Sequence, residues 1–298
     1  MRGQKLPWGA VACLLLLCCL WGGNMAAIKV GSRELAPIFL AGFRSLVASA
    51  CLWVWMRLRG IRVFPSRYLF FHGLMTGVLF GAEFGCIYLG LEFTLASRGY
   101  ILLYTQPFVV ALGAHFFLHD DRLDGVRSAG LVLAFAGVTV LFARGWGETS
   151  LATLPGDLLL LLAGILWGST TLYIKRYLAG RAVPLQTLFY QLAFSAPLLF
   201  GLSFLMEDRI WLGFSGAATL AILYQCIVIA FLSYLLWFEL IHRYPVSLLA
   251  AFTFFTPVSG ALISGVLILG EPLTQSIVLS LALVTVGMFL VNRPARTA

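Results

Sequence analysis

Charged residues are scarce in this chain of 298 residues. Only 11% of its residues are Asp, Glu, Lys or Arg, whereas 61% are hydrophobic. A soluble globular domain carries about 25% charged residues, because its surface faces water. The composition therefore excludes a soluble globule and predicts a polytopic membrane protein. The alternating pattern of a membrane β-barrel is missing as well, so the spans are predicted to be α-helices.

Motifs for several kinds of chemistry are missing too. The six cysteines lie within apolar runs, without a Cys-x-x-Cys pair or a histidine at ligand spacing, which favours free thiols. His115 and His119 have the spacing of two metal ligands on a helix, but no further ligands are arranged with them. No Walker motif occurs, so ATP is not expected as the direct energy source. We expect neither a metal nor a cofactor.

Ten apolar runs of about 20 residues are each long enough to cross a bilayer. They lie at about 9–29, 36–56, 68–91, 96–117, 125–143, 157–178, 184–205, 214–238, 245–268 and 275–292. The first run follows Arg2 and Lys5, as in a signal peptide. No small-x-small cleavage site follows Trp21, so we interpret it as a retained span. The expected fold is an all-α membrane protein of ten transmembrane helices.

The chain contains an internal repeat. The segment from Trp21 to Lys29 has the pattern Trp-Gly, five residues, Ile-Lys, and it recurs from Trp167 to Lys175 at a separation of 146 (167 − 21). Thr105-Gln106-Pro107 matches Phe255-Thr256-Pro257 at a separation of 150 (257 − 107). We therefore expect two five-helix repeats, residues 1–145 and 146–298.

Because five is an odd number, the second repeat is predicted to be inverted in the membrane relative to the first. With a cytoplasmic N-terminus, 14 basic residues fall in inner segments and 5 in outer ones. This asymmetry predicts that both termini are cytoplasmic, with Lys29 outside and Lys175 inside. The basic residues behind the net charge of +8 are thus dispersed over the short segments between spans, where they orient the protein in the membrane. No nucleic-acid partner is expected.

The repeated features together resemble the drug/metabolite transporter superfamily, in particular its ten-span EamA-type members. The matching features are the Trp-Gly pairs, the mid-span prolines Pro107 and Pro257, and the acid-x-Leu turns at 121–123 and 271–273. The first turn lacks the proline that follows Glu271. The resemblance covers nearly the whole chain, and within the family the chain is most similar to YddG-type exporters of aromatic and other amino acids.

Arg44 and Glu83 are ionisable residues inside predicted spans, where a charge costs a few kcal/mol. Each lies 8 residues from the outer end of its span (44 − 36 and 91 − 83), or about 12 Å deep. One interpretation is an intramembrane ion pair that fixes helix packing. In the other, Glu83 faces a hydrated cavity and binds a substrate ammonium group or exchanges a proton. Burial disfavours a charged carboxylate and Arg44 favours it, so its protonation stays open.

Aromatic, amide and hydroxyl residues form a second set, most of it at mid-depth. A mid-membrane Tyr or Trp needs a polar partner, which favours a cavity over the usual interfacial anchoring. Anchoring remains the favoured interpretation for Tyr234 and Trp237, nearer to the inner face. The predicted substrate-binding residues are Trp21, Asn24, Glu83, Tyr100, Tyr104, Gln106, Trp167, Thr171, Tyr224, Gln225 and Thr256.

Pro107 and Pro257 occupy matching positions in the fourth and ninth spans. Each proline lacks a backbone donor for the carbonyl four residues earlier, which kinks the helix and leaves that carbonyl free. Two interpretations remain: a hinge or binding element for alternating access, or a static kink absorbed by packing.

The resemblance implies a secondary transporter in a bacterial inner membrane that exports small amphipathic metabolites, aromatic and other amino acids among them. We expect alternating access through a central cavity, a monomer surrounded by lipid, and no enzymatic activity. The alternatives are a multidrug or nucleotide-sugar carrier and a lipid-modifying membrane enzyme. A nucleotide-sugar site needs several basic residues for phosphates, but Arg44 stands alone. An enzyme needs a His, Asp or Ser constellation near an interface, and none stands out.

Overall fold

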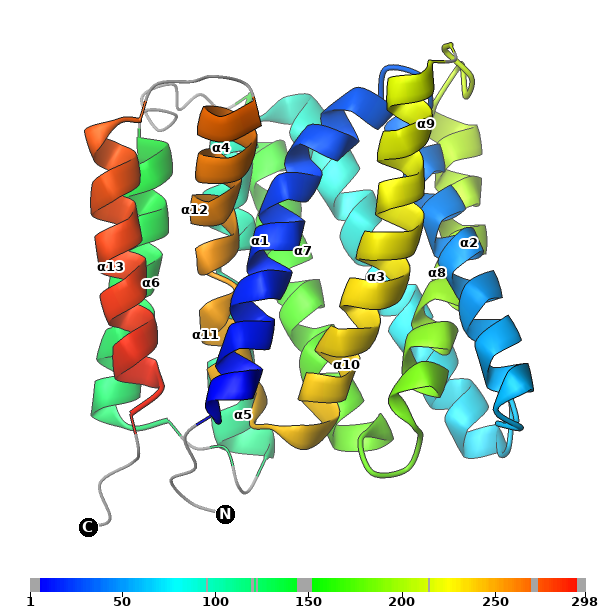
Figure 1. Ribbon diagram of the computed structural model, residues 1–298, viewed down its shortest axis with the longest axis horizontal. Helices are drawn as coiled ribbons and strands as arrows, with labels where there is room; N and C mark the ends of the chain where they lie inside the picture. Colours follow the sequence, from blue (N-terminus) through cyan, green and yellow to red (C-terminus); the bar gives the residue numbers. More distant parts are fainter. Residues whose placement is uncertain are drawn as a thin grey trace.

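The computed structural model describes residues 6–94, 96–118, 121, 123–143, 152–213, 215–268 and 273–293, without the side chains of residues 25, 96–98, 100, 264, 265 and 268. These ranges are nearly all helical (Figure 1). Their only bridges of β type are two isolated ones, Leu35 with Trp211 and Ala179 with Ala182. The expected all-α fold is confirmed.

The helices follow the predicted spans closely. The first half contains α1 (Trp8–Gly31), α2 (Pro37–Leu58), α3 (Arg67–Phe93), α4 (Ala96–Leu103), α5 (Gln106–Phe117) and α6 (Gly125–Phe142). The second half contains α7 (Leu154–Tyr173), η2 (Ile174–Leu178), α8 (Pro184–Met206), α9 (Gly216–Leu223), η3 (Tyr224–Ser233), α10 (Tyr234–Arg243), α11 (Val246–Phe252), α12 (Phe255–Gly260), η4 (Ala261–Ile268) and α13 (Gln275–Val291). The three η segments are π-helical.

Within the described residues, eight helices are long and apolar enough to cross a membrane. Two shorter apolar helices, Ile101–Phe117 and Gln275–Val291, bring the number to the ten that the sequence predicts. The fourth and ninth spans are each interrupted, at Tyr104–Thr105 and at Thr253–Phe254, shortly before Pro107 and Pro257. Both predicted kinks are therefore present as helix breaks, and their role as hinges stays a prediction.

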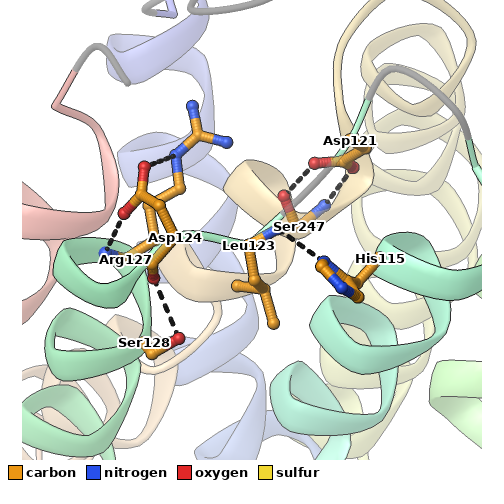
Figure 2. A network of polar contacts seen from close by, with 7 residues as sticks. All are labelled: His115, Asp121, Leu123, Asp124, Arg127, Ser128 and Ser247. Carbon is orange, nitrogen blue, oxygen red and sulfur yellow. Dashed lines mark hydrogen bonds and ion pairs between the residues drawn. The ribbon is translucent and has the colours of Figure 1, made fainter. Parts of the chain in front are cut away.

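Helix starts are specified by the same kinds of residue in both halves. Ser66 accepts a hydrogen bond from the backbone of Leu69 at the start of α3, and Ser215 accepts one from Ala218 at the start of α9. Asp124 caps α6 in the same way (Figure 2). Such side-chain acceptors satisfy backbone N–H groups that have no partner within the helix. The α3 and α9 caps are 149 residues apart (215 − 66).

Glycines allow close helix contacts at repeated positions. A Cβ atom on Gly22 of α1 would lie 2.5 Å from the backbone nitrogen of Gly260, and one on Gly168 of α7 would lie 2.7 Å from Val109 Cβ. Helix α1 therefore packs on α12, and α7 packs on α5 in the matching way. Only a hydrogen atom fits at these positions, as in other closely packed membrane helices.

Helices α6 and α13 lie side by side at one edge of the bundle (Figure 1). A Cβ atom on Gly130 would lie 2.7 Å from the carbonyl oxygen of Gly287, and one on Gly137 would lie 3.0 Å from that of Ser280. The backbones of the two helices thus approach each other directly. In the other layers, α3 packs on α7 and α8, and α2 packs on α8.

The two ends of the described chain meet. The backbone N–H of Leu6 donates to Asn292 Oδ1 at 3.2 Å, so α1 begins and α13 ends at one face, at the bottom in Figure 1. We call this the terminal face, and the opposite one, where Leu35 pairs with Trp211, the distal face. Lys29 lies at the distal face and Lys175 at the terminal face, as the inverted repeat predicts. That the terminal face is cytoplasmic stays a prediction.

Candidate transport cavity

A cavity of about 300 Å³ lies between the two halves of the chain. Its walls come from α1, α2, α3 and α4 of the first half and from α7, η2, α8, η3, α10 and α12 of the second. The volume is at the lower end of the range for small-molecule sites, about 300 to 1,000 Å³. The cavity therefore suits a solute of metabolite size.

Seven of the predicted substrate-binding residues line this cavity: Trp21, Asn24, Glu83, Tyr104, Trp167, Thr171 and Thr256. Arg44, predicted as the partner of Glu83, lines it as well. The side chain of Tyr100 lies outside the described residues.

Three predicted residues point elsewhere. Gln106 is fully buried, and Thr253 donates to its Oε1 at 3.5 Å across the two helix breaks. Tyr224 donates to the carbonyl of Leu20 at 3.1 Å, and Gln225 donates to that of Ala27 at 3.2 Å. Tyr224 and Gln225 thus hold η3 on α1, because backbone carbonyls of the neighbouring helix satisfy them. These three side chains do not line the cavity.

Four polar side chains in the cavity wall carry a buried oxygen without a hydrogen-bond partner in the described part of the chain. The atoms are Asn24 Oδ1, Glu83 Oε2, Gln191 Oε1 and Thr256 Oγ1, and each residue is at most 6% exposed. Buried polar atoms are nearly always hydrogen-bonded, since an unmade bond costs about 1–3 kcal/mol. All four oxygens can accept a hydrogen bond, which suits a ligand that carries N–H or O–H donors.

Arg44 and Glu83 do not form the direct ion pair that the sequence suggested as one interpretation. Both residues are described, and no ion pair within 4.0 Å joins them. Instead, the guanidinium carbon of Arg44 lies 4.8 Å from the centre of the Phe84 ring. This is the geometry of a cation–π contact. Arg44 is 4% exposed and Glu83 is 5% exposed, so both ionisable groups are buried at the cavity.

Aromatic side chains form the apolar wall. The indole of Trp21 donates to Ser233 Oγ at 2.9 Å and meets Trp237 edge to face at 5.5 Å between ring centres. Tyr104 and Trp167 meet edge to face at 5.9 Å. Tyr234 and Trp237 line the cavity, whereas their depth favoured interfacial anchoring. The π-helical η3 precedes both residues and changes the face that α10 presents.

Sequence reasoning missed Gln191 and Tyr88, which also line the cavity. Gln191 lies 147 residues after Arg44 (191 − 44), the separation that also joins Pro37 to Pro184 at the starts of α2 and α8 (184 − 37). Aligning these two helix-start prolines would have identified Gln191 as the repeat counterpart of Arg44. Tyr88 gave no comparable signal on its own.

The cavity extends toward the distal face. Leu91, near the end of α3, lines it and is 41% exposed, whereas Ile241, near the end of α10, lines it and is fully buried. At the terminal face, Lys175 Nζ donates to the carbonyls of Ile241 and Tyr244 at 2.7 and 2.8 Å. A lysine bound in this way satisfies carbonyls at the end of a helix. This contact ties α10 to η2 below the cavity.

A second polar network joins segments of the two halves at the terminal face (Figure 2). Asp121, in the turn between α5 and α6, accepts hydrogen bonds from the backbone N–H of Ser247, at 2.9 Å, and from its hydroxyl. His115 Nδ1 accepts one from the backbone of Leu123 at 3.2 Å, which gives this histidine a structural role. Its predicted partner at metal spacing, His119, lies outside the described residues. The network holds the start of α11 against the first half.

Comparison with known proteins gives consistent results. Residues 8–143 and 154–293 each match the EamA-like transporter family. A probable amino-acid metabolite efflux pump of Salmonella typhimurium is 29% identical, with 95% of this chain and 97% of that protein covered. Its counterpart in Escherichia coli is 28% identical, with 93% and 92% covered. A solved crystal structure with 21% identity has a TM-score of 0.79 over 93% of this chain and 94% of that one, which shows a shared fold.

Proposed function

The chain belongs to the EamA-like transporter family, within the drug/metabolite transporter superfamily, and from this premise we propose its substrates and mechanism. It is a multi-pass transporter of the bacterial inner membrane and not an enzyme. In our proposal it exports small amphipathic metabolites, aromatic and other amino acids among them. The solute crosses by alternating access through the central cavity.

One observation carries the proposal: the cavity between the halves combines an aromatic wall with buried acceptor oxygens that have no partner in the described residues. Trp21 and Trp167 line it from the two repeats. Such a site suits a solute with an apolar body and a polar head, because rings contact the body while acceptors bind the head. A nucleotide sugar fits poorly, since Arg44 is the one basic residue among the described lining residues.

The outward direction and the amino-acid substrates find support in the relatives. The proteins from Salmonella typhimurium and Escherichia coli are named probable amino-acid metabolite efflux pumps. A closer kinship with YddG-type exporters of aromatic amino acids is part of the proposal. The cavity is lined from within one chain, which supports a monomer as the transporting unit.

Alternating access would use the two halves, 1–145 and 146–298, as inverted units. The packing of α1 on α12 and of α7 on α5 supports this division, because the two contacts are related by the repeat. The helix breaks before Pro107 and Pro257 would then serve as hinges. Rocking of the halves about these breaks would expose the cavity at either face in turn.

Reconstituted liposomes test the proposal. Purified protein would be assayed for efflux of labelled Phe, Tyr, Trp, Thr and Met, with and without a pH gradient, and protein-free liposomes are the control. We expect saturable efflux of at least the aromatic amino acids. Absence of flux for all five would refute the amino-acid assignment. Flux that does not depend on the gradient would exclude obligatory coupling to protons.

A further inference from the structure

We propose that the cavity recognises a zwitterion: Glu83 binds the ammonium group of the substrate and Arg44 binds its carboxylate. The inference rests on the proposed function, because it concerns the same cavity. It goes further in assigning the two charges of the substrate to two residues. Its consequence is selectivity for molecules that carry both charges.

An acidic and a basic side chain are buried in one wall without forming an ion pair with each other. Arg44 and Glu83 are 4% and 5% exposed, both line the cavity, and no ion pair within 4.0 Å joins these described residues. A buried charge is costly unless an opposite charge or hydrogen bonds compensate it. A ligand that carries both charges would compensate Arg44 and Glu83 at the same time.

The geometry of α3 keeps the two charges apart. Arg44 lies over the ring of Phe84, 4.8 Å from its centre, and Phe84 directly follows Glu83 in the helix. Consecutive side chains of an α-helix point about 100° apart around its axis. The guanidinium group is therefore held on one side of α3 while the Glu83 carboxylate points to another.

The remaining polar atoms match the two ends of a zwitterion. Asn24 Oδ1 and Gln191 Oε1 are acceptors without a partner in the described chain, like Glu83 Oε2. Three acceptors suit the three N–H donors of an ammonium group. The planar guanidinium of Arg44 presents paired donors that match a carboxylate. Phe80 and Trp21 in the same wall supply contacts for an apolar side chain.

Selectivity follows from what each analogue leaves uncompensated. A monocation without a carboxylate would leave Arg44 unpaired, and a monoanion without an ammonium group would leave Glu83 unpaired. Sites with polar groups that a ligand fails to satisfy discriminate strongly. Loss of one charge-assisted hydrogen bond corresponds to about a 10- to 100-fold loss of affinity.

Ligand binding to the full-length protein in detergent at neutral pH tests the inference. The probes are phenylalanine, phenethylamine and 3-phenylpropionate, which are a zwitterion, a cation and an anion with the same ring. Trp21, Trp167 and Trp237 line the cavity, so intrinsic fluorescence should report its occupancy. We expect phenylalanine to bind at least about tenfold more tightly than either analogue.

Two variants assign the charges. Glu83→Gln should remove the preference for phenylalanine over 3-phenylpropionate and keep its preference over phenethylamine. Arg44→Gln should have the converse effect. The matched controls are Glu92→Gln on α3 and Arg57→Gln on α2, exposed residues outside the cavity lining, which should keep both preferences.

The wild-type measurement needs no variant to fold and is decisive by itself. Equal affinities for the three probes, or no binding of any, would overturn the inference. It would also fall if both variants changed the two preferences alike. The proposed function fails separately, when liposomes show no efflux although phenylalanine is bound selectively. Efflux together with equal affinities would leave the transporter assignment standing and refute the zwitterion site.

Discussion

Gly22 and Gly168 occupy matching positions in the two Trp-Gly segments, and they meet matching neighbours. A Cβ atom on Gly22 would lie 2.5 Å from the Gly260 nitrogen, and one on Gly168 would lie 2.7 Å from Val109 Cβ. Gly260 and Val109 follow their mid-span prolines by three and two residues. The lysines that end the segments differ: Lys175 donates to two carbonyls at the terminal face, whereas Lys29 is exposed at the distal face.

Helix packing and polar contacts at the two faces thus follow the repeat to different degrees. The repeat reproduces the helix packing around the cavity, and it does not reproduce the contacts that tie the two faces. The terminal face is held by Lys175 and by Asp121, while the cavity extends toward the distal face. Packing is thus the symmetric part of the molecule in this conformation, and the polar ties are the asymmetric part.

Substitution of either glycine should have the largest effect. Gly22→Val and Gly168→Val each force side-chain atoms into an occupied helix contact, and we expect a loss of about 3 kcal/mol in stability. Thermal unfolding in detergent measures it. Gly9→Val is the control, because no atom lies within 4 Å of a Cβ atom placed there. Tolerance of one variant but not of the other would break the equivalence of the two glycines.

Lys175→Met should come next. It removes two hydrogen bonds from a charged donor and leaves two carbonyls without it, so we expect a loss of about 2 kcal/mol. Lys29→Met should change stability by less than about 0.5 kcal/mol, because Lys29 is exposed. Unfolding curves of the two variants in the same detergent provide the comparison. Equal losses would mean that Lys29 stabilises the distal face as much as Lys175 stabilises the terminal face.

Asp121→Ala should cost somewhat less, about 1.5 kcal/mol, because it removes the acceptor at the start of α11. A double-mutant cycle with Ser247→Ala isolates the contact between the two side chains. We expect the double variant to lose less stability than the sum of the single variants. Additive losses would show that Asp121 does not act through the Ser247 hydroxyl.

Trp21→Phe should cost less than the substitutions at Gly22, Lys175 and Asp121, about 1 kcal/mol, because an aromatic ring is kept and the hydrogen bond to Ser233 is lost. Trp167→Phe should cost less, since the contact of Trp167 with Tyr104 is a T-shaped ring contact that a phenyl ring can also make. Unfolding measurements on both variants sharpen the comparison between the two tryptophans. A larger loss for Trp167 would contradict the asymmetry.

The sequence was sufficient for the spans, the repeat and seven of the predicted substrate-binding residues. Hydropathy determines where a helix crosses the membrane, and the repeated Trp-Gly pattern brings Trp21 and Trp167 to one cavity. The orientation of a side chain around its helix is harder to predict. Tyr224 and Gln225 lie at the expected depth but face α1, because π-helical turns alter the angular position of residues along η3.

The relation between Arg44 and Glu83 could not be derived from their depth either. Equal depth makes a contact possible, but the guanidinium group lies over the Phe84 ring and forms no ion pair with Glu83. Gln191 was within reach of sequence reasoning through the matching prolines at the starts of α2 and α8. Aligning every span with its repeat counterpart therefore predicts more of the cavity residues than the depth of each residue in the membrane does.

The α6 and α13 pair has a consequence for the origin of the molecule. With the separation of 150 residues found in the later spans (257 − 107), Gly130 corresponds to Ser280 and Gly137 to Gly287. The contact of Gly130 with Gly287 is then the image of the contact of Gly137 with Ser280. Reciprocal contacts of this kind define an isologous interface, in which the same surface is used twice about a two-fold axis. The seam has the geometry of a homodimer whose two subunits have been joined into one chain.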